Sequence, residues 1–220
     1  MAVPEMIEHF LHFIGPRLRR GFEPKTILDL GCCSGEQSVE LAVAFPNADV
    51  HAFECSPDVL RLASENFTAS GIGMRLQLHS VAVDCETGER EFWVADPTIN
   101  CGAGSFFVST GHERIQPLNQ GAIKVTTTRL DEWAVSEGIT RFDLVWADLQ
   151  GAELAAFWGM GELLLTVEAA HVEVAFQELY RGQPLLDEVR SYLQTFGLRL
   201  WVVIHDASGY FGDAIFIRDR

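Results

Sequence analysis

Residues 26–35, TILDLGCCSG, decide the fold. An apolar strand runs into a loop bounded by Gly31 and Gly35, and a segment with helical spacing follows at 36–45. In such a strand, loop and helix unit, the backbone N–H groups at the start of the helix point at whatever binds above the carboxyl edge of the sheet. The stretch therefore predicts a ligand site in an α/β fold.

The segments beyond this stretch alternate between strand-like and helix-like patterns. Strands are expected at 48–54, 75–83, 142–148 and 171–176, and helices at 58–69, 130–137, 152–165 and 184–196. Such alternation indicates a mostly parallel sheet with helices on both faces. An amphipathic helix at 4–20, within an N-terminal segment 1–24, is expected to pack on the domain.

Two strands are expected at the end of the chain, at 198–205 and 213–219, joined only by DASGYFG. A parallel pair needs a crossover of about a dozen or more residues, so these strands must form an antiparallel hairpin. Dinucleotide dehydrogenases continue with crossovers instead. We therefore predict a Rossmann-like class I methyltransferase fold, with about seven mostly parallel strands and a reversed final hairpin.

Residues 84–129 interrupt the alternating pattern. Short β-like pieces at 91–94, 105–108 and 123–128 predict an inserted antiparallel patch with a flexible loop on the substrate side of the sheet. The chain has 220 residues, which can bury one sizeable core and are few for two full domains. We expect a single domain over 1–220.

The composition indicates which binding partners and which cellular compartment to expect. A net charge of -15 repels nucleic acid and anionic membranes. No apolar run approaches the roughly 18 residues that span a bilayer, so a cytoplasmic protein is expected. The five cysteines lack zinc-ligand spacing. They predict free thiols and no metal site.

The loop also indicates which cofactor it binds. The dinucleotide fingerprint GxGxxG needs a second glycine so that a pyrophosphate can approach, and Cys33 stands at that position. This favours S-adenosylmethionine, which has no phosphate. We expect Asp29 to receive its ammonium group and Glu54, at the end of the next strand, to bind its ribose hydroxyls. The alternative is that the loop is only a tight connection between strand and helix and that Glu54 is an exposed acid at the end of a strand.

The chain resembles the FkbM family of methyltransferases. The likeness rests on DLGCCSG, FECSP at 53–57, TTTRLDEW at 126–133, ADLQGAE at 147–153, and HVEV with ELYRGQPL between 171 and 185. It implies S-adenosylmethionine binding and methylation of a hydroxyl on a sugar or natural product. Cofactor contacts are expected from Asp29, Gly31, Cys33, Gly35, Glu54, Ser56 and Ala82.

Two positions depart from the family pattern. The family usually carries Asn at the position of Cys33, which bears on cofactor contacts. It usually carries Lys at the position of Trp146, so a polar contact in the substrate cleft is expected to change or be lost.

Three residues are the leading candidates for the chemistry. Asp148 ends strand 142–148 across the cleft from Asp29, where a carboxylate could orient the acceptor or accept its proton. Its alternative is an N-cap for the helix beginning near Ala152. Glu173 is a charged residue in a strand expected to be buried, facing either a site or a structural partner. His205 ends a strand near the cleft but could simply be exposed, and His112 in the insert is a weaker candidate.

The leading function is therefore O-methylation of a small hydroxylated molecule. The insert and the region around Tyr180 are expected to form the acceptor pocket. The rival is a methyltransferase-like binding or scaffold protein with little or no turnover. A nicotinamide dehydrogenase is disfavoured by Cys33 and by the final hairpin. The sequence does not predict an oligomeric state.

Overall fold

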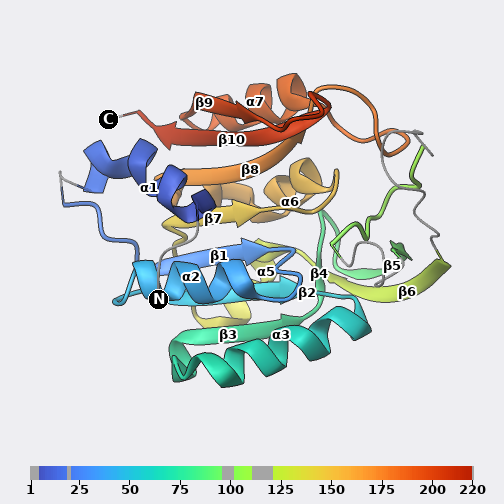
Figure 1. The fold of residues 1–220 in the computed structure, drawn as a ribbon, viewed down its shortest axis with the longest axis horizontal. Helices are drawn as coiled ribbons and strands as arrows, with labels where there is room; N and C mark the ends of the chain where they lie inside the picture. Colours follow the sequence, from blue (N-terminus) through green and yellow to red (C-terminus); the bar gives the residue numbers. More distant parts are fainter. Residues whose placement is uncertain (1–4, 19–20, 96–101, 111–120, 220) are drawn as a thin grey trace.

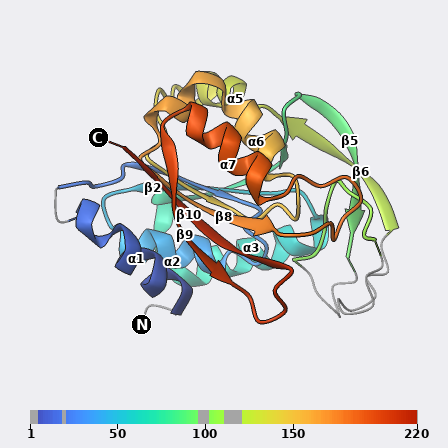
Figure 2. The same ribbon diagram turned by 90° about the horizontal axis from the view of Figure 1, so that it is seen from above.

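The computed structural model describes residues 5–18, 21–95, 102–110 and 121–219. A seven-stranded sheet lies between two layers of helices (Figures 1 and 2). Its strand order is β3-β2-β1-β7-β8-β10-β9. The strands are β1 (Thr26–Leu30), β2 (Asp49–Glu54), β3 (Leu76–Ser80), β7 (Leu144–Ala147), β8 (Ala169–Ala175), β9 (Leu198–His205) and β10 (Phe211–Arg218).

Strand directions confirm the predicted topology. The pairs β2·β3, β1·β2, β1·β7 and β7·β8 are parallel, whereas β10 runs antiparallel to both β8 and β9. The final hairpin was therefore predicted correctly. Because β1 and β7 are neighbours although the chain first builds outward through β2 and β3, the sheet has its switch point between them. Ligands of open α/β sheets bind at such a point, beyond the carboxyl ends of the strands.

Helices cover both faces of the sheet (Figure 2). One face carries α1 (Glu5–Leu18), α2 (Glu36–Ala44) and α3 (Pro57–Ser70). The other carries α5 (Leu130–Glu137), α6 (Glu153–Met160) and α7 (Leu186–Thr195). Short 3₁₀ turns lie at Gly73–Arg75 and Gly161–Thr166. The helix expected at 152–165 ends early because Gly161 adopts a left-handed backbone, with φ +52°.

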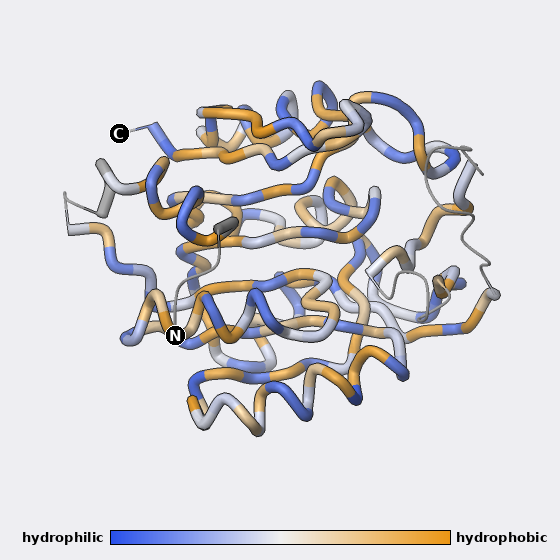
Figure 3. The backbone as a smooth tube through the Cα atoms, viewed as in Figure 1, coloured by the Kyte–Doolittle hydropathy of each residue, from blue (hydrophilic) through white to orange (hydrophobic). Residues whose placement is uncertain are grey.

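The core fills both interfaces between sheet and helices. The central strands are mostly hydrophobic, whereas α2 and α3 alternate between hydrophobic and hydrophilic positions along their length (Figure 3). One cluster of buried side chains joins the sheet to α5, α6 and α7, and a second joins it to α1 and α2. Strands buried on both faces read as continuous apolar runs, which is why the sequence pattern located them.

A second, three-stranded sheet lies beyond the carboxyl ends of the central strands (Figure 1). It contains β4 (Ala82–Val83), β5 (Gly88–Val94) and β6 (Gly121–Thr128). The prediction of one strand over 75–83 was wrong, because β3 ends at Ser80 and β4 leaves the main sheet to pair with β6. The prediction of an antiparallel patch holds for β5·β6, but β4·β6 is parallel.

Residues 105–108 form no regular strand, which corrects a second expectation for this region. Ser105 makes only an isolated bridge to Trp93, and Ser109 one to Tyr180. The latter joins the inserted region to the segment after β8. Residues separated by about 70 positions therefore lie side by side next to the switch point.

Candidate active site

The loop after β1 is held against the end of β2. The N–H groups of Gly31 and Cys32 both donate to the carbonyl oxygen of Phe53, each at 3.0 Å. Gly31 has φ +82°, and a side chain there would collide with the backbone carbonyl of Asp148. Glycine is therefore required both for the left-handed backbone and for the close approach of β7.

Glu54 binds the surrounding backbone with both carboxylate oxygens. Oε1 accepts the N–H groups of Cys55 and Ser56, each at 2.8 Å, and Oε2 accepts that of Cys33 at 3.2 Å. A carboxylate offers about four acceptor sites, so one is left for a ligand hydroxyl. Burial raises the pKa of Glu54 despite these three donors. Glu54 thus fixes the loop and also faces the space above it.

Asp29 lies behind the loop rather than in the open space. Its side chain is 1% exposed and accepts a hydrogen bond from the hydroxyl of Ser38 on α2. Burial, more than any nearby charge, raises its pKa to about 7. Gly35 likewise serves packing, because a side chain there would strike the ring of Phe67 on α3. Neither residue is among the described residues that line the cavity next to the loop.

That cavity holds about 870 Å³ of space, including its open mouth. Five of the seven residues expected to contact the cofactor line it, namely Gly31, Cys33, Glu54, Ser56 and Ala82. Its walls also include side chains from the second sheet and the segment beyond it, among them Phe92, Val94 and Phe106. The structure therefore brings together residues from three separate segments, 31–33, 54–56 and 82, that were expected to bind one ligand.

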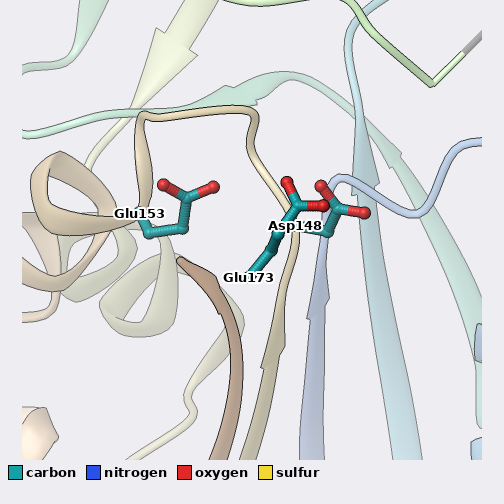
Figure 4. A group of neighbouring side chains, drawn as sticks. All are labelled: Asp148, Glu153 and Glu173. Carbon is teal, nitrogen blue, oxygen red and sulfur yellow. The ribbon is translucent and has the colours of Figure 1, made fainter. Parts of the chain in front are cut away.

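Asp148 stands at the edge of this cavity, directly after β7. Its side chain opens to the cleft, while protein surrounds its other sides and raises its pKa. Figure 4 shows its carboxylate next to that of Glu173, from β8. The side-chain amide of Gln150 donates to Asp148 Oδ1 and to Glu173 Oε2, each at 2.6 Å.

The structure excludes the capping alternative for Asp148. Ala152 is the N-cap residue of α6, and no side chain accepts a hydrogen bond there. Glu153 instead folds back on the loop and accepts the N–H groups of Leu149, at 2.8 Å, and Gly151, at 3.1 Å. These bonds hold the loop in which Gln150 adopts a left-handed backbone with φ +51°.

A second cavity lies on the other side of this loop and holds about 710 Å³ with its open mouth. Its polar lining residues include Gln150, Glu153, Glu173, Tyr180 and Gln183, and its apolar ones include Leu179 and Phe211. Asp148 lines the first cavity and Glu173 the second, so the contact between them lies where the two cavities meet. Glu173 therefore lines a cavity and also has a structural partner in Gln150, so both of its interpretations stay open.

Gln150 is a site residue that the sequence analysis missed. Its carbonyl oxygen accepts the hydroxyl of Ser105 at 2.7 Å, and its side-chain Oε1 accepts the hydroxyl of Tyr180 at 2.8 Å. The only signal in the sequence was its place between Asp148 and Gly151 in ADLQGAE. The expectation that the Tyr180 region helps to form a pocket agrees with its position in the lining.

The structure does not place His205 or Trp146 at this site. His205 is exposed and stacks on Phe176, with ring centroids 4.5 Å apart. Trp146 lies buried beneath α1, stacked on His171 and in edge contact with Phe10. Its side chain thus belongs to the core, and the expectation that it changes a contact in the cleft was wrong. His112 and Cys101 lie outside the described residues.

The carboxylates around the two cavities have no cationic partner within the described ranges. The oxygens of Asp148, Glu153 and Glu173 lie within 4.8 Å of one another, and none forms an ion pair with a described lysine or arginine. Burial raises the pKa of Glu153 to about 7, and burial together with Asp148 holds that of Glu173 well above its usual value. The three carboxyl groups therefore compete for protons, and Glu173 keeps its proton to a higher pH than an ordinary glutamate.

Comparison with known proteins decides the family. The model of the methyltransferase FkbM domain matches residues 29–200. The chain belongs to this family. It is 32% identical to the 2-O-methyltransferase NoeI of Sinorhizobium fredii, over 78% of this chain and 72% of that protein. A release factor glutamine methyltransferase of Deinococcus radiodurans is 38% identical over a shorter stretch, 31% of this chain and 24% of that protein.

Solved structures show the same fold for this FkbM-family chain. The magnesium protoporphyrin IX methyltransferase of Synechocystis PCC 6803 with bound SAM aligns with a TM-score of 0.53 and 13% identity, over 97% of this chain and 81% of that one. The chain is thus a Rossmann-like methyltransferase, for which S-adenosylmethionine is the expected cofactor. None of the helices described has the length and apolar character to cross a membrane.

Proposed function

We propose that this protein transfers a methyl group from S-adenosylmethionine to a hydroxyl group of a small, uncharged polyhydroxyl molecule such as a sugar. The observation that carries the proposal is the junction of two cavities at the Asp148 and Glu173 carboxylates. One cavity has the features of a cofactor site and the other is lined by acceptors suited to hydroxyl groups.

The residues of the first cavity fit this cofactor. Its loop lacks the second glycine that a pyrophosphate requires, since Cys33 stands there with φ +48°. Glu54 keeps an acceptor site toward the cavity, which suits ribose hydroxyls. Apolar side chains such as Val59, Val81 and Phe92 offer surfaces for an adenine ring.

Asp148 carries the chemistry that the protein itself must supply. Bound S-adenosylmethionine supplies an electrophilic methyl group on a sulfonium sulfur. Asp148 faces the cleft at the cavity edge, where its carboxylate can orient the acceptor hydroxyl and take its proton as the new carbon–oxygen bond forms. The walls of the two cavities align the acceptor and exclude water, which is most of what an in-line displacement needs.

The lining of the second cavity favours a neutral acceptor. Glu153 and Glu173 line it, and no described lysine or arginine does, so the described lining offers no cation to bind a phosphate or carboxylate on the acceptor. Carboxylate and amide oxygens accept hydrogen bonds from hydroxyl groups, which a sugar offers in number. The name of the relative NoeI, a 2-O-methyltransferase, agrees with this class of reaction.

The alternative function, a scaffold without turnover, was supported partly by Trp146, and the structure removes that support. Trp146 packs in the core beneath α1 and leaves the cleft unchanged. The expectations that the chain is a single cytoplasmic domain, that it binds no nucleic acid and that it has no metal site stay predictions of the sequence.

The test is transfer from S-adenosylmethionine carrying a deuterated methyl group to a panel of neutral methyl glycosides, followed by mass spectrometry. The proposal predicts a labelled methyl ether on at least one glycoside and none on the matching sugar phosphates. Glu54→Ala serves as the control that lacks the ribose contact and should lose the product. Calorimetric binding of the cofactor without transfer to any acceptor would favour the scaffold.

A further inference from the structure

Gln150 connects the catalytic carboxylate to the wall of the acceptor cavity. Its side-chain nitrogen donates to Asp148 and Glu173, and its side-chain oxygen accepts the hydroxyl of Tyr180. Tyr180 is 6% exposed, and its hydroxyl also donates to the carbonyl oxygen of Ala103 at 3.2 Å. Every polar atom of the Gln150 side chain thus has a fixed partner.

The backbone of Gln150 is fixed as well. Its left-handed φ of +51° is unfavourable for a side chain larger than glycine, so neighbouring contacts must hold it. The hydroxyl of Ser105 donates to its carbonyl oxygen, and Glu153 binds the N–H groups of Leu149 and Gly151. Gln150 therefore has a strained backbone and a side chain whose polar atoms are all hydrogen-bonded, which indicates that its position in the site matters.

The two neighbouring carboxyl groups compete for one proton, and burial together with the charge of Asp148 makes Glu173 hold it more strongly than an ordinary glutamate does. The amide of Gln150 donates to both groups, and no described lysine or arginine competes for the position. A neutral amide can hold the Asp148 carboxylate in place without pairing its charge, whereas a cation would hold it in an ion pair.

We propose that Gln150 is a positioning residue of the methyl transfer: held by Tyr180, its amide fixes the carboxylate of Asp148 at the meeting point of the two cavities and sets it against the acceptor hydroxyl. This inference rests on the proposed function. Glu173 shares the same donor and keeps Asp148 on the side of the cofactor cavity.

Other charged groups also act on Asp148 and must stay unchanged in the test. The charge of Asp148 raises the pKa of titratable groups on several elements. These groups are Asp29 on β1, Glu54 on β2, Glu153 on α6, Glu173 on β8, Tyr180 after β8 and Asp213 on β10. Substitution of the uncharged Gln150 leaves all of them in place. The amide donor lowers the pKa of Asp148, so its loss should raise that pKa.

The variants are Gln150→Met, which keeps the side-chain length without donors, and Tyr180→Phe, which removes only the hydroxyl that orients the amide. Gln194→Met and Tyr192→Phe, both on α7, are the matched controls. For the best glycoside, Gln150→Met should lower kcat by about 10²-fold, the effect typical of a misplaced catalytic group, with little change in the KM of either substrate. The acidic limb of its pH profile should move to higher pH. Tyr180→Phe should also lower kcat and move the acidic limb to higher pH, each by less than Gln150→Met does.

Carboxyl carbon-13 NMR tests the contact without any acceptor. With the Asp148 signal identified by its loss in Asp148→Asn, Gln150→Met should make it titrate at higher pH, and the two controls should not. An unchanged titration, or a wild-type kcat in Gln150→Met, overturns the inference. Absence of transfer in the wild-type protein contradicts the proposed function instead, and the titration still decides the role of the amide.

Discussion

The backbone carbonyl of Asp148 occupies the space in which a side chain of residue 31 would begin. This approach brings the ends of β1 and β7 together, with the N–H of Asp148 donating to the carbonyl oxygen of Leu30 at 2.9 Å. The cofactor loop and the candidate base are therefore parts of one rigid junction.

Gly31→Val should abolish cofactor binding because the new side chain would collide with Asp148 and resist a φ of +82°. Calorimetric titration with S-adenosylmethionine measures the loss, and circular dichroism checks that the fold survives. Gly21→Val is a suitable comparison, since it has the same kind of backbone but nothing within 4 Å of the added atom. Normal affinity in a folded Gly31→Val protein would show that the loop is not the cofactor cradle.

Cys33→Asn should stabilise the protein and retain cofactor binding. Cys33 has φ +48°, a left-handed conformation that costs most side chains about 1–2 kcal/mol and that Asn tolerates better. Thermal melting should show a higher Tm, whereas Cys85→Asn, outside the left-handed region, should not gain in the same way. A lower Tm for Cys33→Asn would mean that the thiol makes contacts worth more than the strain.

Asp148→Asn keeps the size of the side chain and removes the negative charge that accepts a proton. Single-turnover transfer should slow by about 10²- to 10⁴-fold, with cofactor affinity little changed. Because Ala152 rather than Asp148 is the N-cap of α6, the substitution removes no helix cap. A wild-type rate would leave alignment by the cavities as the whole mechanism.

Glu173→Gln should stabilise the protein at high pH only. Burial and the nearby charge of Asp148 raise the folded-state pKa of Glu173 above its unfolded value, about 4.3. Such a group contributes stability below the unfolded pKa and loses it as the pH rises through the folded pKa.

The variant should therefore melt at a higher temperature than wild type at pH 8, by about 2–4 °C for each kcal/mol relieved, and close to wild type at pH 4.5. Glu162→Gln, at an exposed position, serves as the control. The same difference at both pH values would argue that ionisation of Glu173 has no part in it.

Much of the main sheet could be predicted from the sequence because its strands are apolar and are separated by helical spacing. The last two strands were expected at 198–205 and 213–219, and the seven residues between them are too few for a parallel crossover, so the direction of the last strand followed from length alone. The break between Ser80 and Ala82 could not be seen, because the apolar pattern continues through Val81 while the backbone changes sheets. The strand ends there because β3 pairs with β2 and β4 pairs with β6, and local composition does not reveal such pairing.

The site was predicted where motifs lie at strand ends and missed where distant segments meet. Glu54 ends the buried strand β2 and Asp148 directly follows β7, so their positions were predictable. The partner of Gln150 is Tyr180, 30 residues further along the chain, and only the folded structure brings them together. His205 follows a strand end too, but its ring stacks on Phe176 instead of facing a cavity.

The structure of the protein with bound S-adenosylhomocysteine tests the central claim most directly. Ribose hydroxyls should lie within hydrogen-bonding distance of Glu54, and the sulfur should be directed toward Asp148 and the second cavity. A nucleoside bound elsewhere, or a sulfur directed away from Asp148, would contradict it.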